Sequence, residues 1–331
     1  MSKRRGLVLG AGGVLGFSWA VGALTALEQE HGFDFREMDY LVGTSAGSIT
    51  AALLGCGVSV ETMLRHQSGI PVPTDPVIEY DYDVDGGGPL PPIPAPGLGS
   101  AALLVRSALH PFQVTPLAAM SAVLPRGRAS LEPVRSIISG VAGDNPWTAH
   151  PSTWVVAMDY ATGRRIPFGR PGAPDAPLPD AVMASCAIPG WYAPVSIGER
   201  RYVDGGACSS TSLDLLAGLG LDEVYVVAPM ASFAPDRPWS VAARFERRFR
   251  RIVTRRLRRE AEKVRETGTD VTMLAPGPED LEAIGANLMD PRRRSRVLET
   301  SLRASARSLR ELGGGDIAPD DRAANDLSDA M

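Results

Sequence analysis

The stretch YLVGTSAGSITAALLGCG, residues 40–57, contains a Gly-x-Ser-x-Gly pattern centred on Ser45. The apolar residues at its start predict a buried strand, and the small and apolar residues after the serine predict a helix. A serine between Gly43 and Gly47 at such a junction is typical of a nucleophile, because the tight turn exposes its hydroxyl at the carboxyl edge of the sheet. The alternative is a small-residue turn in which Ser45 only caps the helix.

The rest of the chain shows the same alternation of strands and helices. The segment at 5–10 predicts a strand, 10–16 a glycine-rich turn and 17–30 a largely buried helix. Further strands are predicted at 38–43, 153–158, 201–203, 223–228 and 270–274, and helices at 45–54, 99–109, 114–124 and 131–140. This alternation predicts an α/β fold with a mainly parallel sheet.

A segment rich in proline and glycine interrupts the alternation. Residues 81–99, DYDVDGGGPLPPIPAPGLG, are not expected to form regular structure, and loops of this length are often functional. We therefore predict a single α/β domain over 1–315 with an insertion or lid at about 68–130. A linker between two domains is the alternative. The polar tail, 316–331, is predicted to be frayed.

Composition excludes several functional classes. The 331 residues carry a net charge of −4, which gives no whole-molecule attraction to nucleic acid. The cysteines, Cys56, Cys186 and Cys208, are too few and scattered for a disulfide framework. Cys-x-x-Cys and His-Glu-x-x-His spacings do not occur in the sequence, so neither a structural nor a catalytic zinc site is predicted. The oligomeric state stays open.

The N-terminal region allows a targeting interpretation. Lys3-Arg4-Arg5 precedes an uncharged run over 6–27, which could be a signal peptide or a membrane span. However, four glycines within 10–16 weaken a helix there, and no convincing Ala-x-Ala cleavage site follows. We expect a strand, a glycine loop and a buried helix instead, and a cytoplasmic protein.

A nucleophilic serine needs a base. No histidine follows His150, so the chain order Ser, Asp, His of the α/β-hydrolases fails beyond that residue. His110 and His150 could act in another order, but both are predicted on surface loops. A better candidate is Asp204 in RYVDGGACSS, because Gly205 and Gly206 allow a tight turn after it. A simple Asp-Gly turn is the alternative.

The glycine loop GAGGVLG at 10–16 has two interpretations. It could bind a dinucleotide, although Leu15 replaces the third glycine of Gly-x-Gly-x-x-Gly and the strand at 38–43 lacks an acidic residue at its end. It could also be an oxyanion hole, in which successive N–H groups bind an oxygen as it becomes an anion. The proximity of Ser45 favours the oxyanion hole.

Together, these motifs resemble the patatin-like phospholipase family from residue 6 to about 230. The stretches that carry the resemblance are GAGGVLG at 10–16, GTSAGS at 43–48, ASCAIPGWYAPV at 184–195 and DGG at 204–206. The resemblance implies a three-layer α/β sandwich and a Ser–Asp dyad without histidine. Ser45 would be the nucleophile, and Asp204 would orient or deprotonate it. The oxyanion N–H groups would come from Gly12 and Gly13, with Gly10, Gly16, Gly43, Gly47, Gly205 and Gly206 in support.

The implied reaction is phospholipase A-like hydrolysis of lipid acyl esters through an acyl-serine intermediate, without a cofactor. The loop departs from the family pattern, since Ala11 replaces a glycine and Leu15 replaces a basic residue. Ester hydrolysis is therefore predicted more firmly than a phospholipid substrate. The alternatives are an acyltransferase that uses the same serine, a dinucleotide-binding module and an inactive lipid-binding protein.

A basic segment at 244–266 predicts an amphipathic helix. The apolar residues expected on one face are Phe245, Phe249, Ile252, Leu257 and Val264. Such a helix could make a peripheral contact with an anionic membrane through 244–265. Alternatively, it packs on the sheet with a solvated basic face. Arg292–Arg296 are expected to form a solvated helix start.

Overall fold

The structure is a computed structural model that describes residues 3–77, 90–234 and 241–312. The predicted polar tail, 316–331, and part of the Pro/Gly-rich segment lie outside these residues. Within the described part of that segment, 90–99 contain neither helix nor strand, as predicted.

The described strands form one eight-stranded mixed sheet in the order β5-β6-β3-β2-β1-β7-β8, with β4 also paired to β3. The strands are β1 (Arg5–Leu9), β2 (Tyr40–Thr44), β3 (Thr153–Asp159), β4 (Arg165–Phe168), β5 (Val195–Ile197), β6 (Arg200–Asp204), β7 (Glu223–Val227) and β8 (Asp270–Leu274). The neighbouring strands β3, β2, β1, β7 and β8 pair in parallel, whereas β4, β5 and β6 form antiparallel pairs. Each predicted strand is confirmed; β4 and β5 were not predicted.

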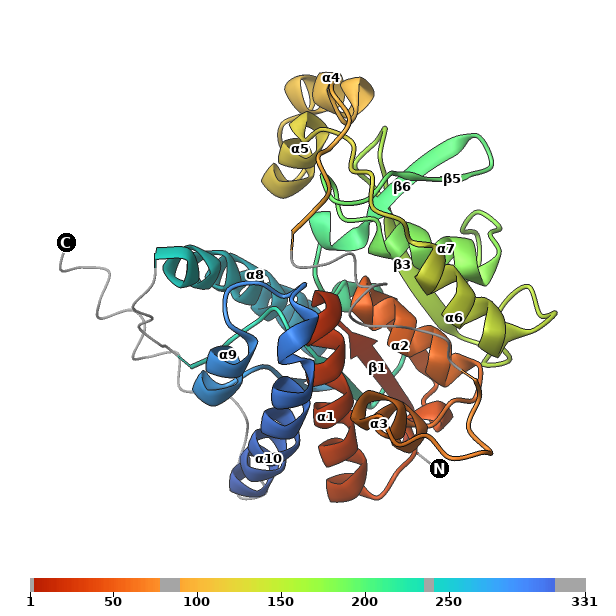
Figure 1. The fold of residues 1–331 in the computed structure, drawn as a ribbon, viewed down its shortest axis with the longest axis vertical. Coiled ribbons are helices and arrows are strands. Elements are labelled where there is room, and N and C mark those ends of the chain that lie inside the picture. Colours follow the sequence, from red (N-terminus) through yellow and green to blue (C-terminus); the bar gives the residue numbers. More distant parts are fainter. Residues whose placement is uncertain (1–2, 78–89, 235–240, 313–331) are drawn as a thin grey trace.

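Helices cover both faces of this sheet, which confirms a three-layer α/β fold (Figure 1). Their bounds are α1 (Gly13–His31), α2 (Ala46–Gly55), α3 (Val60–Ser68), α4 (Ala101–Leu109), α5 (Pro116–Val123), α6 (Glu132–Ala142), α7 (Leu178–Cys186), α8 (Val241–Arg265), α9 (Pro278–Ile284) and α10 (Arg294–Leu312). Side chains alternate along β1, so that Leu7 and Leu9 pack with α1 and α2, while Val8 packs with α8.

The helix α1 begins earlier than predicted. Only 10–12 form the turn after β1, and the helix already starts at Gly13, whereas the sequence predicted a turn over 10–16. Gly16 lies inside the helix because the helix packs closely on Pro229: a Cβ at Gly16 would lie 3.1 Å from the Pro229 Cβ. This glycine therefore permits packing rather than a turn. The run at 6–27 is strand, loop and helix, as expected.

The predicted helices within and just after the insertion are confirmed as α4, α5 and α6. The first two lie together at one end of the molecule, beyond β6 (Figure 1). Leu103 of α4 and Ala118 of α5 share a small core with Met158 of β3 and Val203 of β6. That this region acts as a lid stays a prediction.

The predicted basic helix is α8, but its apolar residues do not share one face. Leu257 and Val264 are fully buried against the sheet, while Phe245 is 76 % and Ile252 59 % exposed. The expectation of a single apolar face was wrong. Phe245 and Ile252 are seven residues apart and share one side of the helix, and so do Leu257 and Val264, but the two pairs lie on different sides. The C-terminal half of α8 therefore packs on the sheet.

The arginine cluster at 292–296 begins with a short 3₁₀ turn, Pro291–Arg293, and α10 starts at Arg294. Arg292 pairs with Asp290, and Arg294 donates to the Gln67 carbonyl. In the described residues, no helix is both long enough and apolar enough to cross a membrane.

Candidate active site

Ser45 occupies a strained turn between β2 and α2. Its φ of 55° is one of two positive values among the described residues other than glycine. Such a backbone is costly for a residue with a side chain, and strain of this kind clusters at functional sites. The Ser45 side chain makes no capping hydrogen bond to α2, so the interpretation of Ser45 as a plain helix cap is not supported. Its hydroxyl is left for another partner.

The glycines of the pattern allow this turn to form. A Cβ at Gly43 would lie 2.3 Å from the Gly47 carbonyl oxygen, and a Cβ at Gly47 would lie 2.1 Å from the Leu9 carbonyl oxygen. Both contacts are far too short for real atoms, so neither position accepts a side chain without moving the backbone. The close approach of α2 to β1 and β2 thus explains both glycines.

Ser185, which sequence reasoning missed, holds the same turn from α7. Its Oγ accepts a hydrogen bond from the Ser45 N–H at 2.8 Å and donates to the Val156 carbonyl at 2.6 Å. Ser185 and Val156 are fully buried. The residue lies within ASCAIPGWYAPV, but nothing in that stretch indicates which of its side chains reaches the serine turn.

Strand register brings Asp204 to this edge of the sheet. Thr44 of β2 lies opposite Val156 of β3, and the next residue of β3, Ala157, lies opposite Asp204 of β6. Adjacent strands are about 4.8 Å apart, so the last residue of β6 is two strands away from the turn that carries Ser45. The sheet therefore brings together the two residues predicted as a dyad.

Asp204 is buried and hydrogen-bonded. Its Oδ1 accepts from the Gly206 N–H at 2.7 Å, and the Ser45 side chain lies beside its carboxyl group in the same pocket. Burial raises the pKa of Asp204 to about 6, although the nearby Ser45 side chain and the Gly206 N–H lower it. A carboxylate with a pKa near 6 is mostly ionised at neutral pH and can still accept a proton. Asp204 therefore both caps the turn that follows it and lines the pocket that contains Ser45.

The loop before α1 presents N–H groups to the same site. The N–H groups of Gly10 and Ala11 donate to backbone carbonyls, both at 2.8 Å. Among the described residues, no protein acceptor is found for the N–H groups of Gly12 and Gly13, which line a pocket with Ser45 and Asp204. The positive end of the α1 dipole lies here as well. Such groups can stabilise a developing oxyanion.

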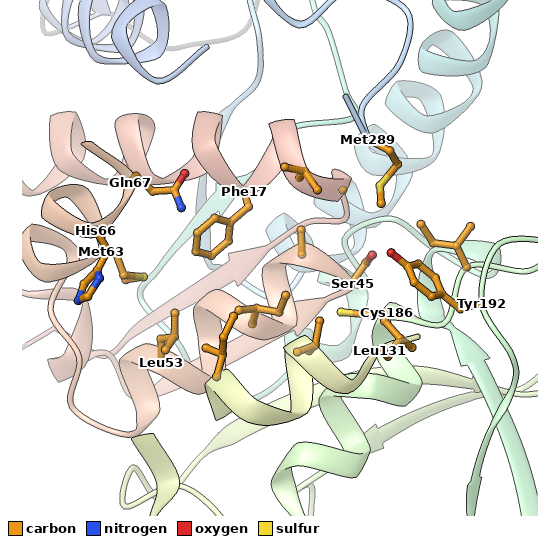
Figure 2. A pocket seen from close by; sticks show the side chains of 17 residues that line it. Phe17, Ser45, Leu53, Met63, His66, Gln67, Leu131, Cys186, Tyr192 and Met289 are labelled. Atoms are coloured by element: carbon orange, nitrogen blue, oxygen red, sulfur yellow. The ribbon is translucent and has the colours of Figure 1, made fainter. Parts of the chain in front are cut away.

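The histidines lie elsewhere. His150 bonds the Met38 carbonyl through Nε2 at 2.6 Å, and His110 is exposed at the end of α4. His31 stacks on Phe33. His66 is the exception, because it lines a pocket that also contains Ser45, but Figure 2 shows the two residues at opposite ends of that pocket. Hence Asp204 is the base candidate that lies beside Ser45.

Two apolar pockets meet at Ser45. One, which we call the slot, has a volume of about 90 Å³ and runs between α1, α2, α3 and α6. The other, which we call the vestibule, has a volume of about 360 Å³ and includes Asp204, Gly12 and residues of α5 and α8. In the described ranges, no group of three or more His, Cys, Asp or Glu could hold a metal ion. The site thus offers a serine, a carboxylate and N–H donors beside apolar walls.

Comparison with known proteins identifies the family. The family model of the patatin-like phospholipases matches residues 7–217, which is more than half of the chain. The chain belongs to the patatin-like phospholipase family. Membership supports a lipid acyl hydrolase at the level of the family. No curated protein matches the chain significantly.

Among solved structures, VipD from Legionella pneumophila is similar to this patatin-like chain. The match has a TM-score of 0.42 and 14 % identity, and it covers 94 % of this chain and 67 % of VipD. The family match ends just after the 3₁₀ turn Leu213–Leu216, so it contains the serine turn, the glycine loop and Asp204.

Proposed function

We propose that the protein hydrolyses lipid acyl esters, in the manner of a phospholipase A, with Ser45 as nucleophile and Asp204 as base. The observation that carries this proposal is that Ser45, at a strained turn, lies beside the buried carboxyl group of Asp204 in one pocket. A neighbouring base is what a serine hydroxyl requires to become a nucleophile. The N–H groups of Gly12 and Gly13 complete the site as the oxyanion hole.

The reaction follows from these positions. Asp204 accepts the hydroxyl proton of Ser45 while Oγ attacks the ester carbonyl carbon, and the carbonyl oxygen becomes an anion beside the N–H groups of Gly12 and Gly13. The bond to the alcohol oxygen then breaks, and Asp204 returns the proton to that oxygen. Water repeats the sequence on the acyl-serine, releasing the carboxylic acid and restoring Ser45. Loss of one oxyanion donor typically costs about 3 kcal/mol of transition-state stabilisation.

We also propose that the first half of α8 contacts an anionic membrane. Phe249 and Val253 line the vestibule, while Phe245 and Ile252, on the adjoining side of the helix, are exposed. Further around the helix lie exposed arginines, Arg244, Arg248, Arg251 and Arg255. Apolar side chains beside a basic stripe suit the boundary between lipid headgroups and acyl chains. A membrane bound there would adjoin the vestibule.

The test combines labelling with turnover. Wild type is treated with a fluorescent fluorophosphonate and assayed with p-nitrophenyl esters, beside Ser45→Ala and Asp204→Asn. We expect labelling and hydrolysis in wild type, loss of both in Ser45→Ala, and a loss of about a hundredfold or more in Asp204→Asn. Product analysis with an added alcohol separates hydrolysis from acyl transfer.

Matched controls are available on exposed surfaces. Ser139→Ala on α6 and Asp175→Asn, both outside the two pockets, repeat the same chemical changes. Both are expected to retain wild-type rates. Hydrolysis by Ser45→Ala at the wild-type rate would show that Ser45 is not the nucleophile. An unlabelled, inactive wild type that still binds vesicles would favour the inactive lipid-binding protein, and calorimetric binding of a nicotinamide dinucleotide would favour the dinucleotide module.

A further inference from the structure

The two pockets at Ser45 are not equivalent, because Asp204 borders only one of them. Ser45 and Gly13 line both pockets, but Asp204, Gly12 and Gly206 line the vestibule alone. An ester that reacts at Ser45 extends in two directions from its carbonyl carbon, toward the acyl chain and toward the alcohol. The position of Asp204 relative to the two pockets determines which part of the ester enters which pocket.

Proton transfer decides the orientation. The proton that Asp204 takes from Ser45 must pass to the alcohol oxygen as that oxygen leaves, so the alcohol must lie within hydrogen-bond reach of Asp204. The alcohol therefore occupies the vestibule. The acyl chain then extends to the other side of Ser45, into the slot.

The slot has the shape and lining for one unbranched chain. Its walls are Val14 and Phe17 of α1, Ala46, Ile49 and Leu53 of α2, and Leu131, Val134 and Ile137 at α6. Figure 2 shows Phe17 midway, with Ser45 and Tyr192 at one end and Leu53, Met63 and His66 at the other. No Lys, Arg, Asp or Glu is found among the described residues that line it. Its volume is about a quarter of that of the vestibule.

Buried side chains of α2 and α3 line the far end of the slot. Leu53 and Met63 are each only 2 % exposed, and Gln67 is 1 % exposed with its Oε1 accepting from the Ser18 hydroxyl at 2.8 Å. From Ala46 to Leu53, α2 advances about 10 Å, because each helical residue rises about 1.5 Å. An extended chain of roughly eight carbons covers that distance, given carbon–carbon bonds of about 1.5 Å.

We propose that the slot is the acyl-chain site and that Leu53 and Met63 set the length of chain it accepts, so that the substrates are esters of unbranched acids of medium length. This inference rests on the proposed function. It also assigns the α5 and α8 walls of the vestibule to the alcohol part of the substrate, not to the acyl chain.

The test makes the same kind of substitution, Met to Ala, once in each pocket. Met63→Ala opens the far end of the slot, whereas Met120→Ala makes the same change in the vestibule. Leu53→Phe fills the slot. Each variant is assayed with p-nitrophenyl esters of acids from four to sixteen carbons, and with butanoate esters of alcohols of increasing size.

We expect wild type to prefer acids of about eight carbons, since a chain of that length reaches from Ala46 to the buried Leu53 along α2. Met63→Ala should raise the kcat/KM ratio of the twelve-carbon to the six-carbon ester by about tenfold, and Leu53→Phe should lower it by about as much. Met120→Ala should leave that ratio unchanged and alter the preference among alcohols. An acyl profile that moves with Met120→Ala but not with either slot variant would overturn the assignment.

A binding measurement separates this inference from the proposed function. In the Ser45→Ala background, free carboxylic acids of the same lengths are titrated by calorimetry, with and without Met63→Ala or Leu53→Phe. The same shift in preferred length supports the slot even if no ester is hydrolysed. Active enzyme with an unchanged acyl profile, together with unchanged acid binding, rejects the slot while leaving the Ser45 reaction intact.

Discussion

At the scale of single residues, the raised pKa of Asp204 has a direct kinetic consequence. The carboxylate must be ionised to accept the Ser45 proton, and burial raises its pKa to about 6. We expect kcat/KM to be constant above pH 7 and to fall about tenfold per unit at pH well below 6. The measurement is a pH profile with a soluble short-chain ester. A rate that stays constant down to pH 4.5 would argue against Asp204 as base.

The same burial predicts a stability effect of opposite sign to the effect on activity. A carboxyl whose pKa is raised on folding stabilises the native state at low pH, and that contribution is lost as the pH rises through about 6. Above pH 7, a change from 3.8 to about 6 corresponds to a penalty on the order of 3 kcal/mol. We expect inactive Asp204→Asn to be more stable than wild type at pH 7.5.

Urea unfolding at two pH values measures this effect. The stability gain of Asp204→Asn should be large at pH 7.5 and should shrink at pH 4, where Asp204 of wild type is mostly protonated in the native state. Asp175→Asn serves as the exposed control. An equal stability difference between Asp204→Asn and wild type at both pH values would show that burial of the Asp204 charge does not cause the difference.

At the scale of elements, the turn after β2 depends on α7. Ser185→Ala removes the hydroxyl that bonds the Ser45 N–H and the Val156 carbonyl. Leaving buried polar groups unpaired costs about 1–3 kcal/mol of folding stability, and a loosened turn should lower kcat about tenfold while KM changes little.

The control for Ser185→Ala is Ser107→Ala. Ser107 also donates to a backbone carbonyl, that of Leu103, but does so within α4 and outside both pockets. Kinetics and thermal unfolding of the two variants are compared. Equal kcat in both would mean that Ser185 contributes only to stability.

Some of these elements could be predicted from the sequence and others could not. The strand before Ser45 and the helix after it follow from a strong local pattern, as does α8, with its run of arginines. The location of α3 was not predicted, because nine residues give little periodicity, yet this helix lines the far end of the slot. Ser185 acts 140 residues away from Ser45 in sequence. The slot, that bond and the pKa of Asp204 arise from packing, which one sequence does not reveal.

At the scale of the whole molecule, the proposed membrane contact predicts a difference between substrates. Phe245→Ser with Ile252→Ser removes two exposed apolar side chains beside the vestibule, each worth roughly 1.5 kcal/mol of apolar transfer. We expect hydrolysis of ester presented in anionic vesicles to fall about tenfold relative to hydrolysis of a soluble ester.

The matched control is Ile70→Ser, an exposed apolar residue just beyond α3. Vesicle cosedimentation is measured in parallel with turnover. If the double variant and the control lose vesicle activity equally, or if neither loses any, the first half of α8 is not the membrane contact.

The proposed reaction depends most on the pair formed by Ser45 and Asp204. The measurement that tests it most directly is the rate of fluorophosphonate reaction as a function of pH, with the modified residue identified by mass spectrometry, in wild type and Asp204→Asn. We predict modification of Ser45, a rate that rises through pH 6 in wild type, and a slow reaction without that rise in Asp204→Asn. Modification at another residue, or the same pH dependence in both proteins, would contradict the account.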